Sequence, residues 1–307
     1  MTALAPMDSS LIVFKKDAMY YIQGAGPDNT GAANQYTQPI YITATVGCSN
    51  QNSIVVMNDG LMFQSDKGIW MLTHDFGVNY VGAPVEKYNS STVTSAVVIP
   101  DTTQVRFTLN TGEILVYDYY FQQWGVFTGT PSISATLYQG MHTLLGSSGL
   151  VLQETPGVYL DNGNPVLMSF LTGFIQLAGL SGYQRIYEIQ LLGDYISPHL
   201  LQIQIGYNFG ALSEQAVIEP TNATGVYGSD DLYGQTTPYG GPGRLEQWRI
   251  QTGTQKCQTF QFSLQELYDP SFSVPAGAGF TLSTMTCTIG VNRSYRPVKA
   301  ANTVGTA

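Results

Sequence analysis

The stretch Ser53–Thr73, SIVVMNDGLMFQSDKGIWMLT, contains two apolar runs joined by a tight turn at Asn58-Asp59-Gly60, and a second turn follows at Ser65–Gly68. Glycine adopts positive φ angles without steric cost and aspartate tolerates them, so Asp-Gly is typical of β-hairpin turns. The stretch therefore predicts three antiparallel strands joined by two hairpins, the last of them carrying Trp70.

Similar units occur three more times in the first half of the chain. They are Ser10–Gly24, Val105–Gly129 and His142–Asp161. Aligning their turns pairs Asp17 with Gly60, Gly112 and Gly149, with spacings of 43, 52 and 37 residues. A degenerate period of about 40–50 residues with several short strands in each unit is typical of propeller blades. Four units are few for a closed propeller, so either blades are missing from this chain or another segment completes the arc.

The second half predicts longer strands without the turn period. The candidates are Val166–Ala178, Arg185–Tyr195, Leu200–Phe209, Gln247–Thr252, Thr259–Leu267 and Ser283–Asn292. Alternating strands without helices favour an antiparallel β-sandwich. We therefore expect an all-β chain with a loose N-terminal arm at 1–9, propeller-like blades at 10–161, a β-sandwich-like domain at 162–295 and a flexible tail at 296–307.

The composition indicates a subunit of a large assembly. Only 11% of the residues are charged, while the chain has 20 Tyr and 13 Phe. Loss of charge with enrichment of aromatic residues is characteristic of buried interfaces, although a surface rich in Gln, Asn, Ser and Thr is the alternative explanation. The net charge of −9 argues against a protein that grips nucleic acid, but not against a passage through which nucleic acid slides.

The sequence predicts neither a cofactor nor a metal site nor catalysis. Its three cysteines, Cys48, Cys257 and Cys287, are widely spaced and favour a reducing compartment over a disulfide framework. His74, His142 and His199 are isolated from one another and lack the spacing of metal ligands. No signal peptide or membrane span is expected, because Met1–Ser10 has no apolar run and no apolar segment reaches about 18 residues.

Several runs resemble tail proteins of short-tailed bacteriophages, of the nozzle or tail tubular protein B type, also called tail DNA stabilization proteins. The resemblance is carried by Asp59–Trp70, by YDYYFQQWGVFTG at Tyr117–Gly129, by Gly182–Phe209 and by Glu246–Glu266. It implies a homo-oligomeric ring, a hexamer, in the virion tail after synthesis in the host cytoplasm. It also implies contacts with portal or adaptor proteins and with tail fibres or spikes, around a channel that DNA passes without specific binding.

Two sets of residues are candidates for roles in such a ring. Trp70 and Trp124 are expected at equivalent positions in the cores of their blades. Acidic residues are frequent in the predicted turns, and we expect Asp59, Glu113 and Asp118 to line a shared channel. A negative lining would repel phosphate and lower friction on passing DNA.

A propeller adhesin or lectin, or a glycosidase, is the alternative interpretation. Ser65–Trp70 is similar to the Asp box of sialidase-type propellers, but one residue is missing between its Ser and Asp. A glycosidase needs two carboxylates on either side of the scissile bond, and the adjacent pair Asp230-Asp231 would point apart in a strand. For a glycan-binding protein, we expect the long loops Ala25–Gln38 and Glu219–Gly243 to make the contacts.

Overall fold

The computed structural model describes residues 1–32, 35–129, 131–179, 182–195, 199–218, 245–254, 256–268 and 279–292. The chain is all-β, as the sequence predicts, and is built from several small antiparallel sheets. It divides into two compact units, Met1–Pro156 and Gly157–Ala307, whereas the sequence predicts this boundary at residue 161.

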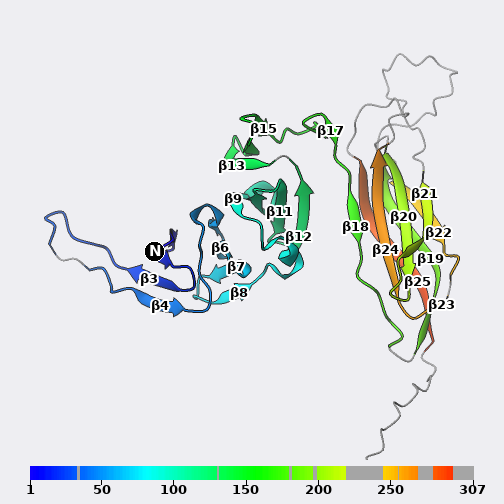
Figure 1. The fold of residues 1–307 in the computed structure, drawn as a ribbon, viewed down its shortest axis with the longest axis horizontal. Coiled ribbons are helices and arrows are strands. Elements are labelled where there is room, and N and C mark those ends of the chain that lie inside the picture. The colour runs from blue at the N-terminus through cyan, green and yellow to red at the C-terminus, as the bar shows by residue number, and fades with distance from the viewer. Residues whose placement is uncertain are drawn as a thin grey trace, which may run out of the picture. The chain divides into compact units, whose positions relative to one another are not determined.

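The first unit contains four sheets in which the strands follow chain order (Figure 1). The first sheet is β1 (Ala3–Met7), β2 (Ser10–Phe14), β3 (Met19–Gln23) and β4 (Ile40–Thr43). The second sheet is β5 (Val55–Met57), β6 (Gly60–Ser65), β7 (Gly68–Thr73) and β8 (Val78–Tyr80). The third is β9 (Val93–Ile99), β10 (Gln104–Leu109), β11 (Glu113–Asp118) and β12 (Gln123–Thr128). The fourth has three strands, β13 (Ser132–Tyr138), β14 (Met141–Gly146) and β15 (Val151–Gln153).

The predicted loose arm at residues 1–9 is wrong, because Ala3–Met7 pairs with β2 along its whole length. Pro6 is tolerated there because β1 is an edge strand, where a missing N–H breaks no ladder. Short 3-10 helices lie in the connections, at Gln51–Ser53 (η1), Ala83–Tyr88 (η2) and Pro100–Thr102 (η3).

Both turns predicted within Ser53–Thr73 are confirmed. Met57 pairs with Gly60, and Ser65 pairs with Gly68, so both turns have two residues. Gly60 has φ +135°, and a Cβ atom there would lie 2.1 Å from the Leu72 carbonyl oxygen. No other residue fits at this position without moving the backbone.

The alignment of the repeat was displaced by one strand in the second sheet. Asp17, Gly112 and Gly149 lie in or beside turns between second and third strands, but Gly60 follows the turn between first and second strands. The equivalent turn in the second sheet is Asp66-Lys67. Both turns of this sheet carry a glycine, so the turn residues alone did not distinguish them.

The second sheet is covered on both faces, and every residue of β6 is buried. Leu61, Phe63 and Leu72 pack with residues of the first sheet, including Phe14. On the opposite face, Met62 joins the third sheet in another core. This double coverage explains why the strands here are continuous apolar runs and do not alternate.

Successive sheets of the first unit approach one another most extensively through their first strands. β1 lies near β5, β5 near β9, and β9 near β13, which also approaches β10. The Ser95 hydroxyl on β9 donates to the Ala135 carbonyl on β13, at 3.0 Å. The four sheets are thus packed in sequence order, each on the one before it.

The second unit contains two larger antiparallel sheets. One is ordered β18 (Ser169–Leu171), β24 (Phe260–Tyr268), β20 (His199–Tyr207) and β21 (Leu212–Ile218). In the other, β19 (Tyr183–Tyr195) pairs on one side with β22 (Leu245–Gln251) and β23 (Lys256–Cys257) and on the other with β25 (Phe280–Asn292). Between Leu160–Asp161 (β16) and Asn164–Pro165 (β17), Asn162-Gly163 forms a two-residue hairpin turn with positive φ at both residues.

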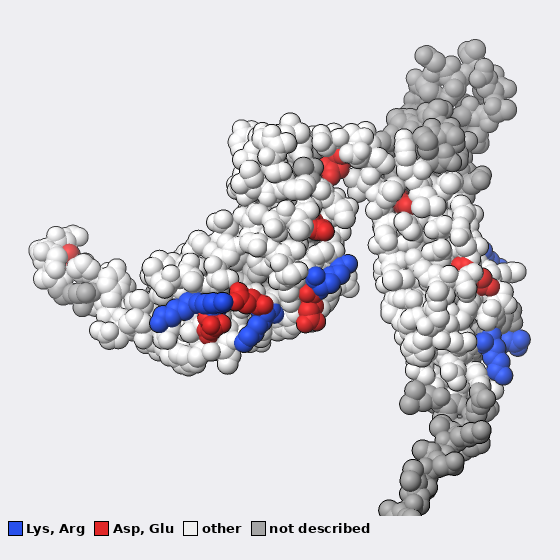
Figure 2. All heavy atoms as spheres, viewed as in Figure 1, with Lys and Arg blue, Asp and Glu red and all other residues white. Residues whose placement is uncertain are grey.

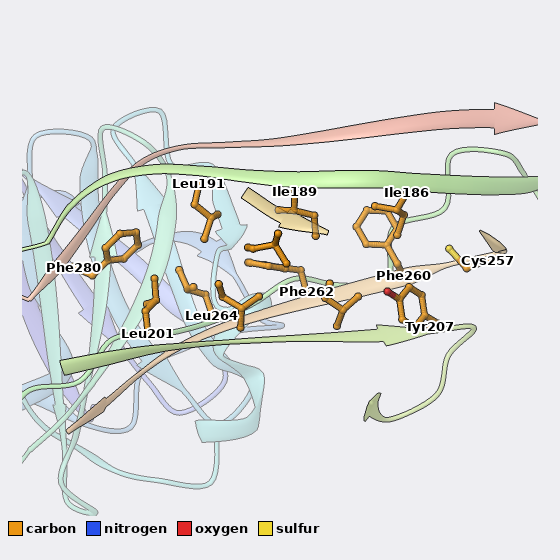
Figure 3. Close-up of a cluster of buried hydrophobic side chains, with 13 residues drawn as sticks. Ile186, Ile189, Leu191, Leu201, Tyr207, Cys257, Phe260, Phe262, Leu264 and Phe280 are labelled. Atoms are coloured by element: carbon orange, nitrogen blue, oxygen red, sulfur yellow. The ribbon is translucent and has the colours of Figure 1, made fainter. Parts of the chain in front are cut away.

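Side chains from both larger sheets make one core (Figure 3). Ile189 and Leu191 of β19 meet Leu201 of β20 and Phe262 and Leu264 of β24. The predicted alternation of Leu200–Phe209 is confirmed, since Leu201, Ile203 and Ile205 are buried and Gln202 and Gln204 are not.

Five of the six strands predicted in this half are found close to their expected bounds. Val166–Ala178 contains only the short strand β18, and β21 was not predicted. The loop Glu219–Gly243 and the tail 296–307 lie outside the described residues.

Glu266 is 2% exposed and ties two connections of the second unit to β24. Its carboxylate accepts from the backbone N–H of Met168 at 2.8 Å and of Phe280 at 2.6 Å. We expect Glu266→Gln to lower the free energy of unfolding of this unit by about 1.5–3 kcal/mol, because an amide loses the charge and one acceptor. Urea unfolding measures the change, and the partly exposed Glu188→Gln is the control. A loss no larger than that of the control would contradict this role.

Candidate functional site

The turns of the first unit gather charge at one end of its sheets. In a sheet whose strands follow chain order, the first turn and the third turn lie at the same end. His74, in the third turn of the second sheet, connects two such ends: its Nδ1 lies 2.7 Å from Asp8 Oδ2, in the first turn of the first sheet. Its Nε2 lies 2.8 Å from the Asn58 carbonyl oxygen. Burial, and then the charges of Asp59 in the second sheet and Asp118 in the third, raise the pKa of Tyr117.

We call this the acidic end of the first unit. Its carboxylates are Asp8, Asp28, Asp59, Asp75, Asp101 and Asp118, all in connections or at strand ends. Glu154 also lies at this end, because it follows β15 and its N–H donates to the His142 carbonyl, and it pairs with Arg106. No lysine among the described residues of the first unit lies there. The fourth sheet adds the turn Gln139-Gly140, where a Cβ on Gly140 would lie 3.9 Å from Asp101 Oδ2.

The four lysines of the first unit, Lys15, Lys16, Lys67 and Lys87, lie at the opposite end, which we call the lysine end. Lys16 Nζ is 3.1 Å from Asp66 Oδ2, joining the second turns of the first and second sheets. Lys67 Nζ donates to the Thr45 carbonyl at 2.6 Å. Figure 2 shows basic side chains of this unit lying among acidic ones.

The net negative charge of the first unit is therefore confined to the acidic end. Away from it, the four acidic residues Asp17, Asp66, Glu86 and Glu113 are matched by the four lysines, and the charge of Glu154 is matched by Arg106. Of the six turn carboxylates at the acidic end, Asp8 pairs with His74, and the other five form no ion pair with the described residues. A field of one sign over one end attracts cations and repels phosphates.

Hydrogen bonds hold several of these carboxylates in place. Asp118 Oδ1 accepts from the backbone N–H of Tyr120 at 2.9 Å and of Phe121 at 3.0 Å. The Thr30 hydroxyl and N–H lower the pKa of Asp28, and the Thr73 hydroxyl and the Gly77 N–H lower that of Asp75. Asp8, with the Asn58 carbonyl, raises the pKa of His74, which favours its charged form. Asp59 and Asp101 accept no hydrogen bond from the described residues.

The structure brings two of the three predicted channel residues together and separates the third. Asp59 and Asp118 lie at the acidic end, but Glu113 begins β11 and lies at the lysine end, where it accepts from the Thr111 hydroxyl. Glu113 and Asp118 are the two ends of one six-residue strand, about 17 Å apart. Asp75 was missed, although Thr73-His74-Asp75 carries the turn-forming Asp that could have indicated it.

Trp70 and Trp124 do not occupy equivalent positions. Trp70 lies on the third strand of its sheet, beside the core between the first and second sheets, with its ring centroid 5.0 Å from that of Tyr80. Trp124 lies on a fourth strand, beside the core between the second and third sheets. Its indole N–H donates to the Val81 carbonyl at 2.8 Å, whereas Trp70 Nε1 is buried without a partner among the described residues.

The interface between the third and fourth sheets is polar. Arg106 Nη1 lies 2.5 Å from Glu154 Oε2, and the Arg106 side chain is almost fully buried. His142 is buried nearby, and burial, followed by the charge of Arg106, lowers its pKa to about 4. Thr108 Oγ1, Ser132 Oγ and His142 Nε2 are buried without a hydrogen-bond partner among the described residues.

Among the described residues, no group of three His, Cys, Asp or Glu side chains could hold a metal ion. His199 begins β20 in the second unit, whereas His74 and His142 belong to the first. Burial raises the pKa of the thiols of Cys48, Cys257 and Cys287. No helix in the described part of the chain is long and apolar enough to cross a bilayer.

A small hollow in the second unit is lined by Ile203, Glu214 and Ile250 among others. The Glu214 carboxylate accepts from the Tyr207 hydroxyl and from the Thr254 N–H, at 3.0 Å for the latter. Burial, and then this bond, raises the pKa of Tyr207. Among the described residues, Glu214 is the one carboxylate that lines this hollow. Asp230-Asp231 lies outside the described residues.

Comparison with family models and with curated proteins found no match for this chain.

Proposed function

We propose that this chain is a structural subunit of the tail of a short-tailed bacteriophage, where copies form a ring around the path of the genome. The ring, a hexamer by the sequence resemblance, is made in the host cytoplasm and joins portal or adaptor proteins and tail fibres or spikes. It acts by assembly, without catalysis or a cofactor. The resemblance of Tyr117–Gly129 and Glu246–Glu266 to nozzle proteins supports this proposal.

The proposed architecture is an incomplete propeller followed by a β-sandwich-like domain. Two observations support the propeller: the sheets of the first unit pack face to face in chain order, and their first strands approach one another most extensively. Blades of a propeller meet at their first strands around an axis and diverge outward. The shared core of the two larger sheets supports the sandwich.

The observation that carries the proposed conduit is the confinement of the net charge of the first unit to its acidic end. Carboxylates that repeat around a ring would surround the passage with negative charge. Such a lining repels the DNA backbone and keeps it from adhering to the wall. Attraction would instead slow the genome during release.

The ring is tested by electron microscopy of the purified protein, which should show closed annular particles with a central opening. Particles that remain single copies at high protein concentration, with or without the natural tail components, would exclude the ring.

The charged lining is tested by reversing two carboxylates that hold no structural hydrogen bond, in the variant Asp59→Lys/Asp101→Lys. Particles carrying it should release DNA more slowly than wild type at low salt, and the difference should narrow as salt screens the attraction. The control is Asp17→Lys/Glu86→Lys, which makes the same change of charge at the lysine end. Release followed with a DNA-binding dye gives the rates; equal rates for both variants would contradict an acidic lining.

A glycan-binding protein is the second candidate. An exposed aromatic pair at the acidic end favours it: Tyr120 is 73% and Phe121 66% exposed, with ring centroids 4.9 Å apart. Aromatic faces beside carboxylates such as Asp118 suit stacking with sugar rings and bonding to their hydroxyls. Binding of the single-copy protein to surface glycans, lost in Tyr120→Ala/Phe121→Ala, would support this function over the ring.

A further inference from the structure

The first sheet has an open face, which we call the leading face. It contains Leu4, Pro6, Leu11, Val13, Tyr20, Ile22 and Tyr41. None of these side chains is charged, and none is fully buried: Leu11 is 39% and Tyr41 55% exposed. Lys15 lies at the border of this face, with its Nζ 5.1 Å from the centre of the Tyr20 ring.

The fourth sheet ends the stack with an open face of its own, the trailing face. Its apolar residues are Tyr138, Met141, Leu145 and Val151, with Ser134, Thr136, Thr143 and Gln153 between them. Tyr138 is 58%, Leu145 38% and Val151 64% exposed. The other face of this sheet carries the buried His142 and meets the third sheet. The trailing face is also free of charge.

Within the chain, the face that corresponds to the leading face is always covered by the preceding sheet. In the second sheet it carries Leu61 and Phe63 on the second strand, and these pack on Ile12 and Phe14 of the first sheet. In the third sheet it carries Phe107 and Leu115, which pack with Met62 of the second. The first sheet alone lacks such a predecessor among the described residues of its unit, as the fourth lacks a successor.

We propose that the leading face of one copy packs on the trailing face of the next copy, face to face, as neighbouring sheets pack within one chain. This contact would be the one by which copies associate in the ring, so the inference rests on the proposed function. A surface that meets a different surface of its partner gives a head-to-tail contact, which closes into rings or extends into chains.

Two features favour a second copy as the occupant. Both faces are uncharged, so joining them buries no unpaired charge, which would cost several kcal/mol. A head-to-tail contact also repeats the orientation of the subunit, so the acidic ends of all copies remain on one side. Pairing of two leading faces about a two-fold axis perpendicular to the strands would place acidic ends on opposite sides and break the lining.

The test uses two variants, each with a charge on one of the two faces. Leu11→Lys places a charge on the leading face only, and Val151→Lys on the trailing face only; both positions are exposed, so folding is retained. Leu11→Lys keeps only its trailing face intact, and Val151→Lys keeps only its leading face. The contact needs one intact face of each kind, so neither variant can associate with itself, and a mixture can form one contact only. Sedimentation velocity and native mass spectrometry should show each variant alone as single copies, and an equal mixture as a one-to-one heterodimer and nothing larger.

The wild type should form larger species under the same conditions, and Tyr120→Lys, with its charge at a 73% exposed position off both faces, should assemble as wild type does. Rings that persist in both blocked variants would overturn this contact while leaving the proposed ring intact. Open chains in the wild type, with heterodimers in the mixture, would support the contact and exclude the ring. A wild type that is single at all concentrations, with no heterodimer in the mixture, would overturn both.

Discussion

Replacing Phe63 by alanine should destabilise the first unit by about 3–5 kcal/mol and leave the second unit unchanged. Phe63 is fully buried on β6, and its ring centroid lies 5.1 Å from that of Phe14 on the first sheet. The substitution removes a large apolar volume between two sheets that cannot close over the gap. Calorimetry should resolve two unfolding transitions in the wild type. The substitution should lower the midpoint temperature of only the transition that belongs to the first unit.

The matched variant is Phe262→Ala, at an equally buried position in the core of the second unit. It should destabilise the second unit by a similar free energy and lower the midpoint temperature of the second unit's transition. Phe121→Ala, at a 66% exposed position, controls for loss of an aromatic ring at the surface and should change neither by more than about 0.5 kcal/mol. If Phe63→Ala and Phe262→Ala both shift every transition equally, the two units unfold as one, and their description as separate compact units is wrong.

Acidification should destabilise the first unit through His142. Its pKa is about 4 in the folded protein and near the ordinary 6.5 when unfolded, so the unfolded chain binds the proton more readily. The stability that neutral His142 provides is therefore present above pH 6.5 and is lost as the pH falls toward 4. The full loss amounts to about 3 kcal/mol, and most of it precedes the titration of ordinary carboxylates.

Urea unfolding of the first unit at pH 7.5, 5.5 and 4.5 measures this loss. His142→Gln should flatten the dependence between pH 6.5 and 4, whatever its effect on stability at neutral pH. His74→Gln is the control, because Asp8 raises the pKa of His74 and so its contribution has the opposite sign, fading as the pH rises. The same slope in wild type and His142→Gln would show that another group is responsible.

The sequence predicted local structure well where one turn determines it. The Asn58-Asp59-Gly60 and Ser65–Gly68 turns fixed three strands of the second sheet, and the alternation of Leu200–Phe209 fixed β20. β21 was missed because its apolar residues, Leu212, Ala216 and Ile218, are separated by Glu214, which lines a hollow and bonds Tyr207. Strand β1 was predicted as a loose arm. Pro6 in Ala3–Met7 argues against a strand unless that strand lies at the edge of a sheet.

The candidate site was predicted only in part, for a reason that lies in strand pairing. Turn carboxylates such as Asp59 and Glu113 look alike in sequence, since each lies directly beside a glycine, in Asn58-Asp59-Gly60 and Thr111-Gly112-Glu113. Which end of a sheet each one occupies depends on whether its turn is odd or even in the count of strands. That count was wrong in two places, because strand β1 was not predicted and because Gly60 was aligned with turns that lie between second and third strands. The polar interface around Arg106 and His142 gave no signal at all, because its members are far apart in the chain.

Lys15 and Lys16 directly follow Phe14, whose carbonyl accepts from the Thr2 N–H at 2.9 Å, so they lie where β1 begins. Every lysine of the first unit is at this end of its sheets. An amine-reactive dye would label that end and no other part of the unit. A surface coupled through the lysines of this unit, and not through Lys256 or Lys299 of the second unit, would hold these sheets with the carboxylates toward the solvent.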